Sequence, residues 1–102
     1  MNYIPNYFLS DSNIEYFEIP PNIIKIEYWA FSNCKDLSKI IWPTSVKELG
    51  SSIFAGCNKL KEITFLGTKK EWRKIPKIRN ISWRGYSYIK KIICTDGEIS
   101  LR

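Results

Sequence analysis

The sequence has no histidine, and this absence excludes more chemistry than any other feature of the composition. Histidine is the commonest general acid or base and the commonest metal ligand, and it activates many nucleophilic serines and cysteines. The carboxylates are scattered along the chain, without a pattern that would set two of them facing each other, as glycoside hydrolysis requires. We therefore expect no enzyme activity, no catalytic residue and no cofactor.

Cysteine is also scarce, and its spacing excludes the common metal sites. Cys34, Cys57 and Cys94 are separated by 23 and 37 residues, so no C-x-x-C pair exists to nucleate a zinc site, and we expect no bound metal. Three cysteines cannot all pair within one chain. We expect Cys34 and Cys57 to stack in adjacent turns as reduced, buried side chains, with a disulfide between them as the alternative. Cys94 is expected to be a core residue.

Long apolar runs are missing as well. No stretch approaches the roughly 20 residues that span a bilayer, and the first ten residues lack the basic start and apolar run of a signal peptide. We therefore expect no membrane partner and a cytoplasmic location, unless the chain is a fragment of a longer secreted protein.

What remains is a basic chain of 102 residues whose charge is unevenly placed. The net charge is +6, with −2 over residues 1–58 and +8 over residues 59–102. The length and the 44% apolar content suit a single domain over residues 1–102. The asymmetry of the charge indicates one end or face that meets an acidic partner.

An internal repeat of 23 residues organises the first two thirds of the chain. With that shift Phe31 falls on Phe54 and Cys34 on Cys57, and the leucine, isoleucine and proline positions match in the same way. One such unit cannot bury its own apolar side, so units of this kind stack as a solenoid.

The first unit, residues 1–18, matches less well. In the 23-residue register Phe8 precedes Phe31, but Asp11 stands where the later units have cysteine. We interpret this unit as a degenerate repeat or N-terminal cap. Its edge, near residues 14–19, has little to cover it, so we expect either a monomer or a homodimer joined along this edge.

Each unit ends in a short predicted strand, in which apolar residues such as Ile40 and Trp42 alternate with others. The segments between the strands, 28–31 and 52–55, are predicted to be short helical turns. The outward strand positions of successive units form rows, and repeat proteins generally bind partners through such rows. We predict a partner-binding surface made of Tyr16, Glu18, Lys39, Ile41, Glu62 and Thr64.

A different pattern follows Phe65. Thr68 and Glu71 have the spacing of a capping box, which predicts a short helix over about residues 69–74. An Asp-Gly pair between the apolar runs 89–94 and 98–101 predicts a β-hairpin. The helix and the hairpin would cover the open end of the solenoid.

These motifs resemble the BspA-like leucine-rich repeat family. The pattern I-P-x-x-[IV]-x-x-[IL]-x-x-x-[AI]-F-x-x-C-x-x-L-x-x-I is similar to residues 19–40 and 42–63, and the family's terminal G-T-x-x-x-W and C-x-D-G motifs are similar to residues 67–72 and 94–97. The resemblance implies a β-rich leucine-rich-repeat solenoid of about two and a half repeats. It places the repeats at residues 19–66 and a cap of a short helix and a C-terminal β-hairpin at residues 67–102. It also implies a recognition scaffold with varied partners.

The C-terminal third offers a second candidate surface, since basic side chains interleaved with aromatic ones suit a nucleic-acid backbone and stacked bases. The aromatic residues are Trp72, Trp83, Tyr86 and Tyr88, of which Trp72 fits a buried capping residue equally well. We call the basic residues the basic patch: Lys69, Lys70, Arg73, Lys74, Lys77, Arg79 and Arg84.

The expected function is non-catalytic binding of another protein. One form of it would be a small inhibitor that occludes a site on a larger partner, such as a nucleic-acid-binding protein. The alternative is the binding of nucleic acid or of a nucleoprotein through the basic patch. These two functions would use different surfaces, the strand rows and the C-terminal end.

Overall fold

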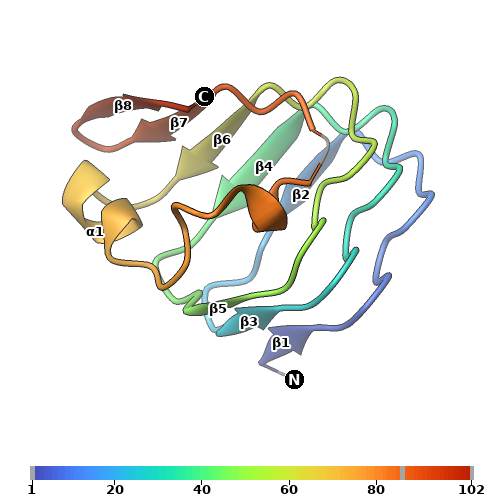
Figure 1. Cartoon of the computed structure of the whole chain (residues 1–102), viewed down its shortest axis with the longest axis horizontal. Helices are drawn as coiled ribbons and strands as arrows, with labels where there is room; N and C mark the ends of the chain where they lie inside the picture. Colours follow the sequence, from blue (N-terminus) through green and yellow to red (C-terminus); the bar gives the residue numbers. More distant parts are fainter. Residues whose placement is uncertain (1, 86, 102) are drawn as a thin grey trace.

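The computed structural model describes residues 2–85 and 87–101. In this part of the chain the backbone winds in coils that stack in sequence order, and each coil adds one strand to each of two sheets (Figure 1). A three-stranded parallel sheet contains β1 (Tyr3–Ile4), β3 (Lys25–Ile26) and β5 (Glu48–Leu49). A five-stranded sheet contains, in spatial order, β2 (Tyr16–Glu18), β4 (Lys39–Trp42), β6 (Glu62–Phe65), β7 (Lys91–Cys94) and β8 (Gly97–Ser100).

The strands of the larger sheet follow from the alternation of their residues. In β4, Ile40 and Trp42 are fully buried whereas Lys39 is exposed, and β6 repeats the pattern with Ile63 and Phe65 inward. Because successive side chains of a strand point to opposite faces, the inward residues of neighbouring strands stack into one core.

The first coil contributes to both sheets, but its register differs from the predicted one. β2 pairs with β4 at the expected spacing of 23 residues, with Tyr16 opposite Lys39. β1 pairs with β3 at a spacing of 22 residues, with Ile4 opposite Ile26. One residue is therefore missing from the corner that joins the two strands of the first coil.

The shorter corner moves Leu9 into the position that the sequence analysis gave to Phe8. The Cys34 Sγ donates a hydrogen bond to the Leu9 carbonyl at 3.0 Å, and the Cys57 Sγ donates to the Phe31 carbonyl at 2.9 Å. These equivalent bonds place Leu9, and not Phe8, at the position of Phe31. The earlier alignment was wrong because two adjacent apolar residues fit the pattern and a shift without gaps selects the second coil's register.

Asp11 is likewise not the counterpart of Cys34. Asp11 and Asn33 both have left-handed backbones, with φ of 66° and 58°, so they occupy the same turn position in successive coils. The cysteine position of the first coil is therefore taken by Ser12.

The segments 28–31 and 52–55 form turns and not the helical turns that the sequence predicted. Trp29 has a left-handed φ of 61°, and the Phe31 N–H donates to the Ile53 carbonyl of the next coil at 2.9 Å. A helix needs such N–H groups within its own segment, whereas here the ladder between coils uses them.

The capping box forms at the start of α1 (Lys69–Arg73). The Glu71 N–H donates to the Thr68 Oγ1 at 3.1 Å, and the Thr68 N–H donates to the Glu71 Oε1 at 2.9 Å. The Lys69 N–H donates to the Asp96 Oδ1 at 2.9 Å, which ties the first turn of the helix to the turn of the β7–β8 hairpin.

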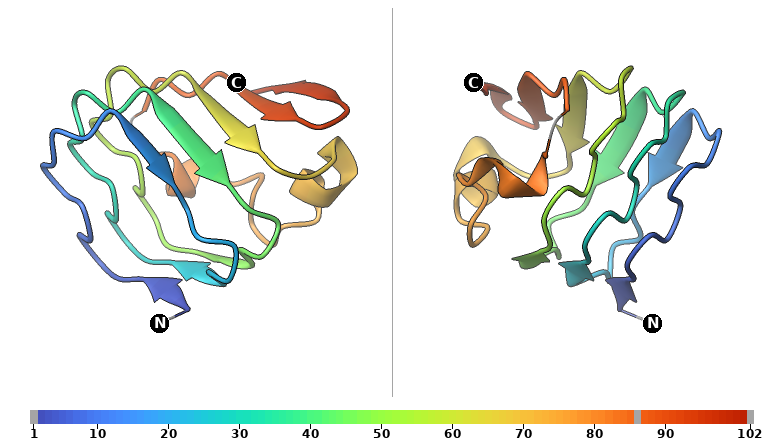
Figure 2. Two further views of the ribbon diagram at one scale, coloured as in Figure 1. Left: turned by 180° about the vertical axis from the view of Figure 1, so that it is seen from behind. Right: turned by 45° about the vertical axis from the view of Figure 1, so that its right-hand side comes forward.

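The C-terminal segment adds a further layer to the stack of coils (Figure 2). β7 pairs in parallel with β6, and β8 runs back along β7 as the antiparallel partner of a hairpin. On the turn side, the 3-10 helix η1 (Ile81–Trp83) covers the last coil: the carbonyls of Ser82 and Trp83 accept hydrogen bonds from Ser52 and Ile53 at 2.6 and 2.8 Å. The last coil is thus covered on both its strand side and its turn side.

Five buried aromatic rings join the last coil to the C-terminal segment, and we call them the aromatic junction. Trp42 packs edge-to-face on Trp72 and Trp83, with ring centroids 5.1 and 5.6 Å apart. Trp72 also packs on Phe65 at 5.1 Å, and Trp83 packs on Phe54 at 6.2 Å. Edge-to-face pairs add about 0.5–1.5 kcal/mol each beyond the burial of area.

The capping box generates a stability prediction. Thr68→Ala removes the side-chain acceptor of the Glu71 N–H, and we expect the free energy of unfolding to fall by about 1 kcal/mol. Urea unfolding followed by circular dichroism measures this change. Lys70→Ala, at an exposed position of the same helix outside the capping box, is the control and should unfold within about 0.3 kcal/mol of the wild type. Equal midpoints for the two variants would contradict the assignment.

Candidate functional site

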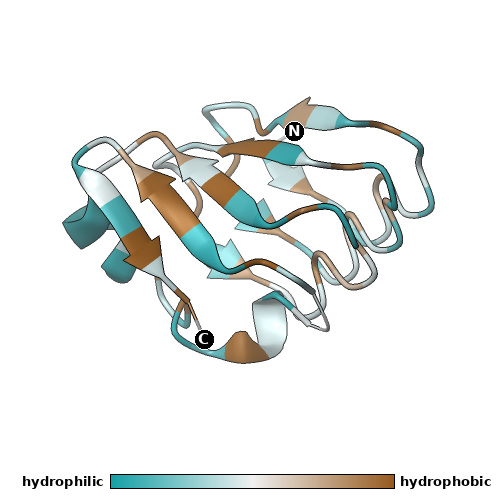
Figure 3. Ribbon diagram, turned by 90° about the horizontal axis from the view of Figure 1, so that it is seen from above, coloured by the Kyte–Doolittle hydropathy of each residue, from teal (hydrophilic) through white to brown (hydrophobic). Residues whose placement is uncertain are grey.

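The six residues predicted to bind a partner lie together on the outer side of the five-stranded sheet. Tyr16 lies opposite Lys39, and Ile41 lies between Glu18 and Thr64 of the neighbouring strands. Glu62 follows in the same row as Lys39, and all six side chains are exposed or half-buried. Figure 3 shows apolar and polar residues alternating along these strands.

Two further strands extend this surface, which the sequence analysis missed. Lys91 lies opposite Glu62, Ile93 lies opposite Thr64, and Glu98 lies opposite Ile93. The sequence contained a signal for this arrangement, because β7 reads Lys-Ile-Ile-Cys where β4 reads Lys-Ile-Ile-Trp. The outward residues of the sheet form what we call the outer sheet face: Tyr16, Glu18, Lys39, Ile41, Glu62, Thr64, Lys91, Ile93, Glu98 and Ser100.

The outer sheet face has a weakly polar centre between charged residues. Half-buried Ile41, Thr64 and Ile93 form a row across β4, β6 and β7. Beside this row the Lys91 Nζ lies 4.0 Å from a Glu62 carboxylate oxygen and 3.7 Å from one of Glu98. Protein interfaces have this organisation, with a centre depleted of charge and a polar rim.

At the far end of this face the Tyr16 hydroxyl donates a hydrogen bond to the Glu18 Oε1 at 3.1 Å. This bond holds the neutral phenol in place and raises the pKa of Tyr16 above its ordinary value. Both side chains are exposed, so the pair is available to a partner.

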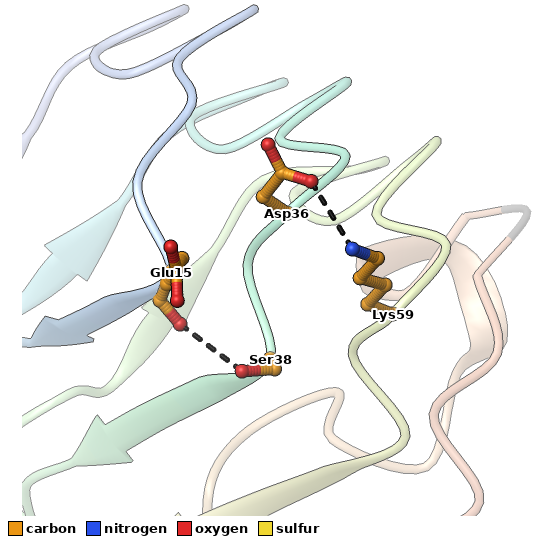
Figure 4. Close-up of polar contacts among 4 residues, drawn as sticks. All are labelled: Glu15, Asp36, Ser38 and Lys59. Atoms are coloured by element: carbon orange, nitrogen blue, oxygen red, sulfur yellow. Dashed lines mark hydrogen bonds and ion pairs between the residues drawn. The ribbon is translucent and has the colours of Figure 1, made fainter.

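Polar contacts between coils border the face at the corner that precedes the strands (Figure 4). The Lys59 Nζ lies 3.3 Å from the Asp36 Oδ1, and the Ser38 Oγ donates to the Glu15 carbonyl at 3.3 Å. A shallow groove of about 240 Å³, which Lys59 and Ser38 help to line, runs from this corner to Thr64 on the outer sheet face. The corner and the face therefore form a continuous surface.

The basic patch is divided among three places. Arg73, Arg79 and Arg84 line one groove, between α1, η1 and the end of β8. Lys74 and Lys77 line shallow hollows on another side, next to Lys47 of the preceding coil. The two remaining lysines of the patch belong to the first turn of α1: Lys69, half-buried near Gly97, and Lys70, which is exposed.

The interleaved aromatic residues do not form a stacking platform. Trp72 and Trp83 are 2% and 1% exposed and belong to the aromatic junction. Tyr88 is 56% exposed, but it does not line the groove of the three arginines. The fourth residue of the predicted set, Tyr86, lies outside the described residues.

The three cysteines are free thiols inside the core. Burial raises the pKa of Cys94, and the hydrogen bond with Cys34 together with burial raises the pKa of Cys57. The same hydrogen bond lowers the pKa of Cys34, but the Cys34 side chain has no exposed surface. A buried thiol of this kind does not offer the accessible thiolate that a nucleophile or metal ligand requires.

Two structural searches concern metals and membranes. Across residues 2–85 and 87–101, no three His, Cys, Asp or Glu side chains are grouped so that they could hold a metal ion together. None of the helices in those ranges is long and apolar enough to span a bilayer.

Stacked coils with parallel strands, closed by a non-repeating segment, define the class of leucine-rich-repeat-like solenoids. The family model for the BspA type Leucine rich repeat region (6 copies) matches residues 2–100. The chain therefore belongs to the BspA-type leucine-rich repeat family, whose members are typically non-catalytic and whose domains generally mediate protein interactions. The comparisons with curated proteins and with solved structures gave no match.

The Tyr16–Glu18 pair predicts a shift that can be measured in solution. In Glu18→Ala the Tyr16 hydroxyl loses its acceptor, and we expect its pKa to fall toward the ordinary value of about 10. NMR titration of protein with labelled tyrosine rings follows this pKa directly. Glu48→Ala, in the smaller sheet, is the control and should leave Tyr16 unchanged. A Tyr16 pKa that is the same in all three proteins would contradict the contact.

Proposed function

We propose that this chain is a non-catalytic protein-interaction module that binds a partner protein through the outer sheet face. The observation that carries the proposal is the continuous row of Ile41, Thr64 and Ile93 across three strands, with charged residues on either side. Interfaces concentrate binding energy in such a centre and use the rim to exclude water.

The size of the face indicates how much more of the surface takes part. Five strands spaced about 4.8 Å apart make a face about 20 Å wide. A standard interface takes about 800 Å² from each partner, which corresponds to a square with sides of about 28 Å. We therefore propose that the contact extends into the groove toward Lys59 and Ser38.

The form of the interaction that suits the size of the chain is occlusion. A body of 32 × 28 × 22 Å can cover a single site on a larger partner, as a small inhibitor does. The partner is proposed to be cytoplasmic, since free buried thiols in the core are typical of a reducing compartment.

The edge of the first coil bears on oligomeric state. β1 and β2 each occupy an outer position in their sheet, and such edges can pair with a second chain. We keep two proposals, a monomer and a homodimer joined along β2, which light scattering of the purified chain distinguishes.

A variant of the row of apolar side chains tests the proposed surface. Ile41→Asp places a charge at the centre of the outer sheet face, and we expect it to reduce the partner captured from a nuclease-treated host lysate at least tenfold, since a charge buried at an interface costs more than about 1.4 kcal/mol. Mass spectrometry of the captured material gives the amount of partner.

The matched control is Ile24→Asp, because Ile24 is 41% exposed beside the smaller sheet and outside the outer sheet face. This variant should capture the partner as the wild type does, and thermal melts show whether both variants are folded. Undiminished capture by a folded Ile41→Asp protein would refute the proposed surface.

The alternative function, binding of nucleic acid or of a nucleoprotein through the basic patch, rests on the three arginines that line one groove. Phosphate contacts give an affinity that falls with salt, with a log–log slope near −0.9 for each phosphate neutralised on duplex DNA. We expect a labelled duplex to show no measurable binding at physiological salt. Tight binding with a steep slope, lost in the double variant Arg73→Glu/Arg79→Glu, would instead establish the alternative.

A further inference from the structure

The groove of the three arginines has features that a solubilising charged surface does not need. It has a volume of about 380 Å³ and lies between α1, η1 and the end of β8. That volume falls in the lower part of the range of ligand pockets, enough for one or two side chains of a bound segment. We call it the arginine groove.

The walls of the arginine groove are held in place by hydrogen bonds. The Trp83 Nε1 donates to the Ile78 carbonyl at 2.8 Å, which fixes the segment between α1 and η1. The Leu101 N–H donates to the Lys90 carbonyl at 2.7 Å, which fixes the end of β8. The groove is therefore preformed, and a ligand would not have to order it.

The charge that lines the groove is of one sign. Arg73, Arg79 and Arg84 face it, and no carboxylate is among the described residues that line it. The Arg84 Nη1 donates to the Ile89 carbonyl at 3.2 Å, which orients that guanidinium at the wall. Guanidinium groups bind carboxylates through paired hydrogen bonds, so an acidic ligand complements this lining.

The remainder of the lining is aliphatic. Ile81 is 69% exposed, the largest exposed fraction among the big apolar side chains of the described chain, and half-buried Ile99 and Leu101 lie across the groove. A ligand that combines an apolar side chain with carboxylates would cover Ile81 and bind the arginines at the same time.

Aliphatic walls favour a peptide over a nucleic acid. Base binding without sequence readout relies on exposed aromatic rings, and the tryptophans at this groove are 2% and 1% exposed. We propose that the arginine groove binds an acidic segment of a partner protein, in which one or two leucine-like side chains stand between carboxylates. This site lies apart from the outer sheet face, and the proposal does not depend on the function assigned to that face.

The test uses a labelled peptide of alternating glutamate and leucine and measures fluorescence anisotropy with the full chain. We expect wild-type protein to bind it, and Arg73→Ala/Arg79→Ala to weaken binding at least about tenfold, since two charge-assisted bonds are lost. Ile81→Ala should weaken it about threefold or more. Lys35→Ala/Lys47→Ala removes the same charge at exposed positions outside the groove and should bind as the wild type does.

Three probes complete the design: a glutamine-for-glutamate peptide, an alanine-for-leucine peptide, and a single-stranded oligonucleotide of the same length. We expect all three to bind at least about tenfold more weakly than the parent peptide. Several outcomes would overturn the proposal: no peptide binding by the wild type at about 1 mM, equal binding by the double arginine variant, or tighter binding of the oligonucleotide than of the peptide. Thermal melts confirm that the variants are folded.

Discussion

The packing of Trp42 on Trp72 and Trp83 is the interaction on which the rest of the structure depends. A single coil cannot bury its apolar side, so every coil needs a neighbour, and the last coil needs one that does not itself repeat. The aromatic junction provides that neighbour. It fixes α1 and η1 against the end of the stack, and the backbone bonds from Ser52 and Ile53 to η1 continue the ladder of the coils.

This junction also determines what the molecule presents to a partner. With the C-terminal segment held in place, β7 pairs in parallel with β6, and the outward rows run from the first coil to the hairpin without interruption. The outer sheet face therefore belongs to both the repeated and the non-repeated parts of the chain. The arginine groove arises from the same packing, because α1, η1 and β8 meet only where the cluster holds them.

Much of the fold could be predicted from the sequence, because stacking imposes a period that is visible in the residues. The period of 23 placed β4 and β6 and their inward and outward sides, and the Thr68–Glu71 spacing placed the start of α1. The first coil was misaligned because its corner is one residue shorter, and both Phe8 and Leu9 suit an apolar position. A shift without gaps cannot detect such a deletion.

The candidate surfaces could be predicted only in part. The six residues from the repeats follow directly from the period, whereas β7 lies 29 positions after β6 and outside that period, although its residues repeat those of β4. The basic patch was contiguous in sequence, but its members lie in different places, since the turns after α1 send neighbouring residues to different sides. Which three arginines share a groove is a property of the tertiary packing alone.

Native-state hydrogen exchange of the free chain tests the central claim, that coils and C-terminal segment form one continuous body. The amides of Ile53 and Lys90 bond across the junction, to the carbonyls of Trp83 and Lys61, whereas the Phe31 amide bonds within the coils. The account predicts that all three amides open with the same free energy, that of global unfolding. Exchange of Ile53 and Lys90 through a much cheaper opening, with Phe31 still protected, would mean that the C-terminal segment detaches alone, and the outer sheet face would then not be a single surface.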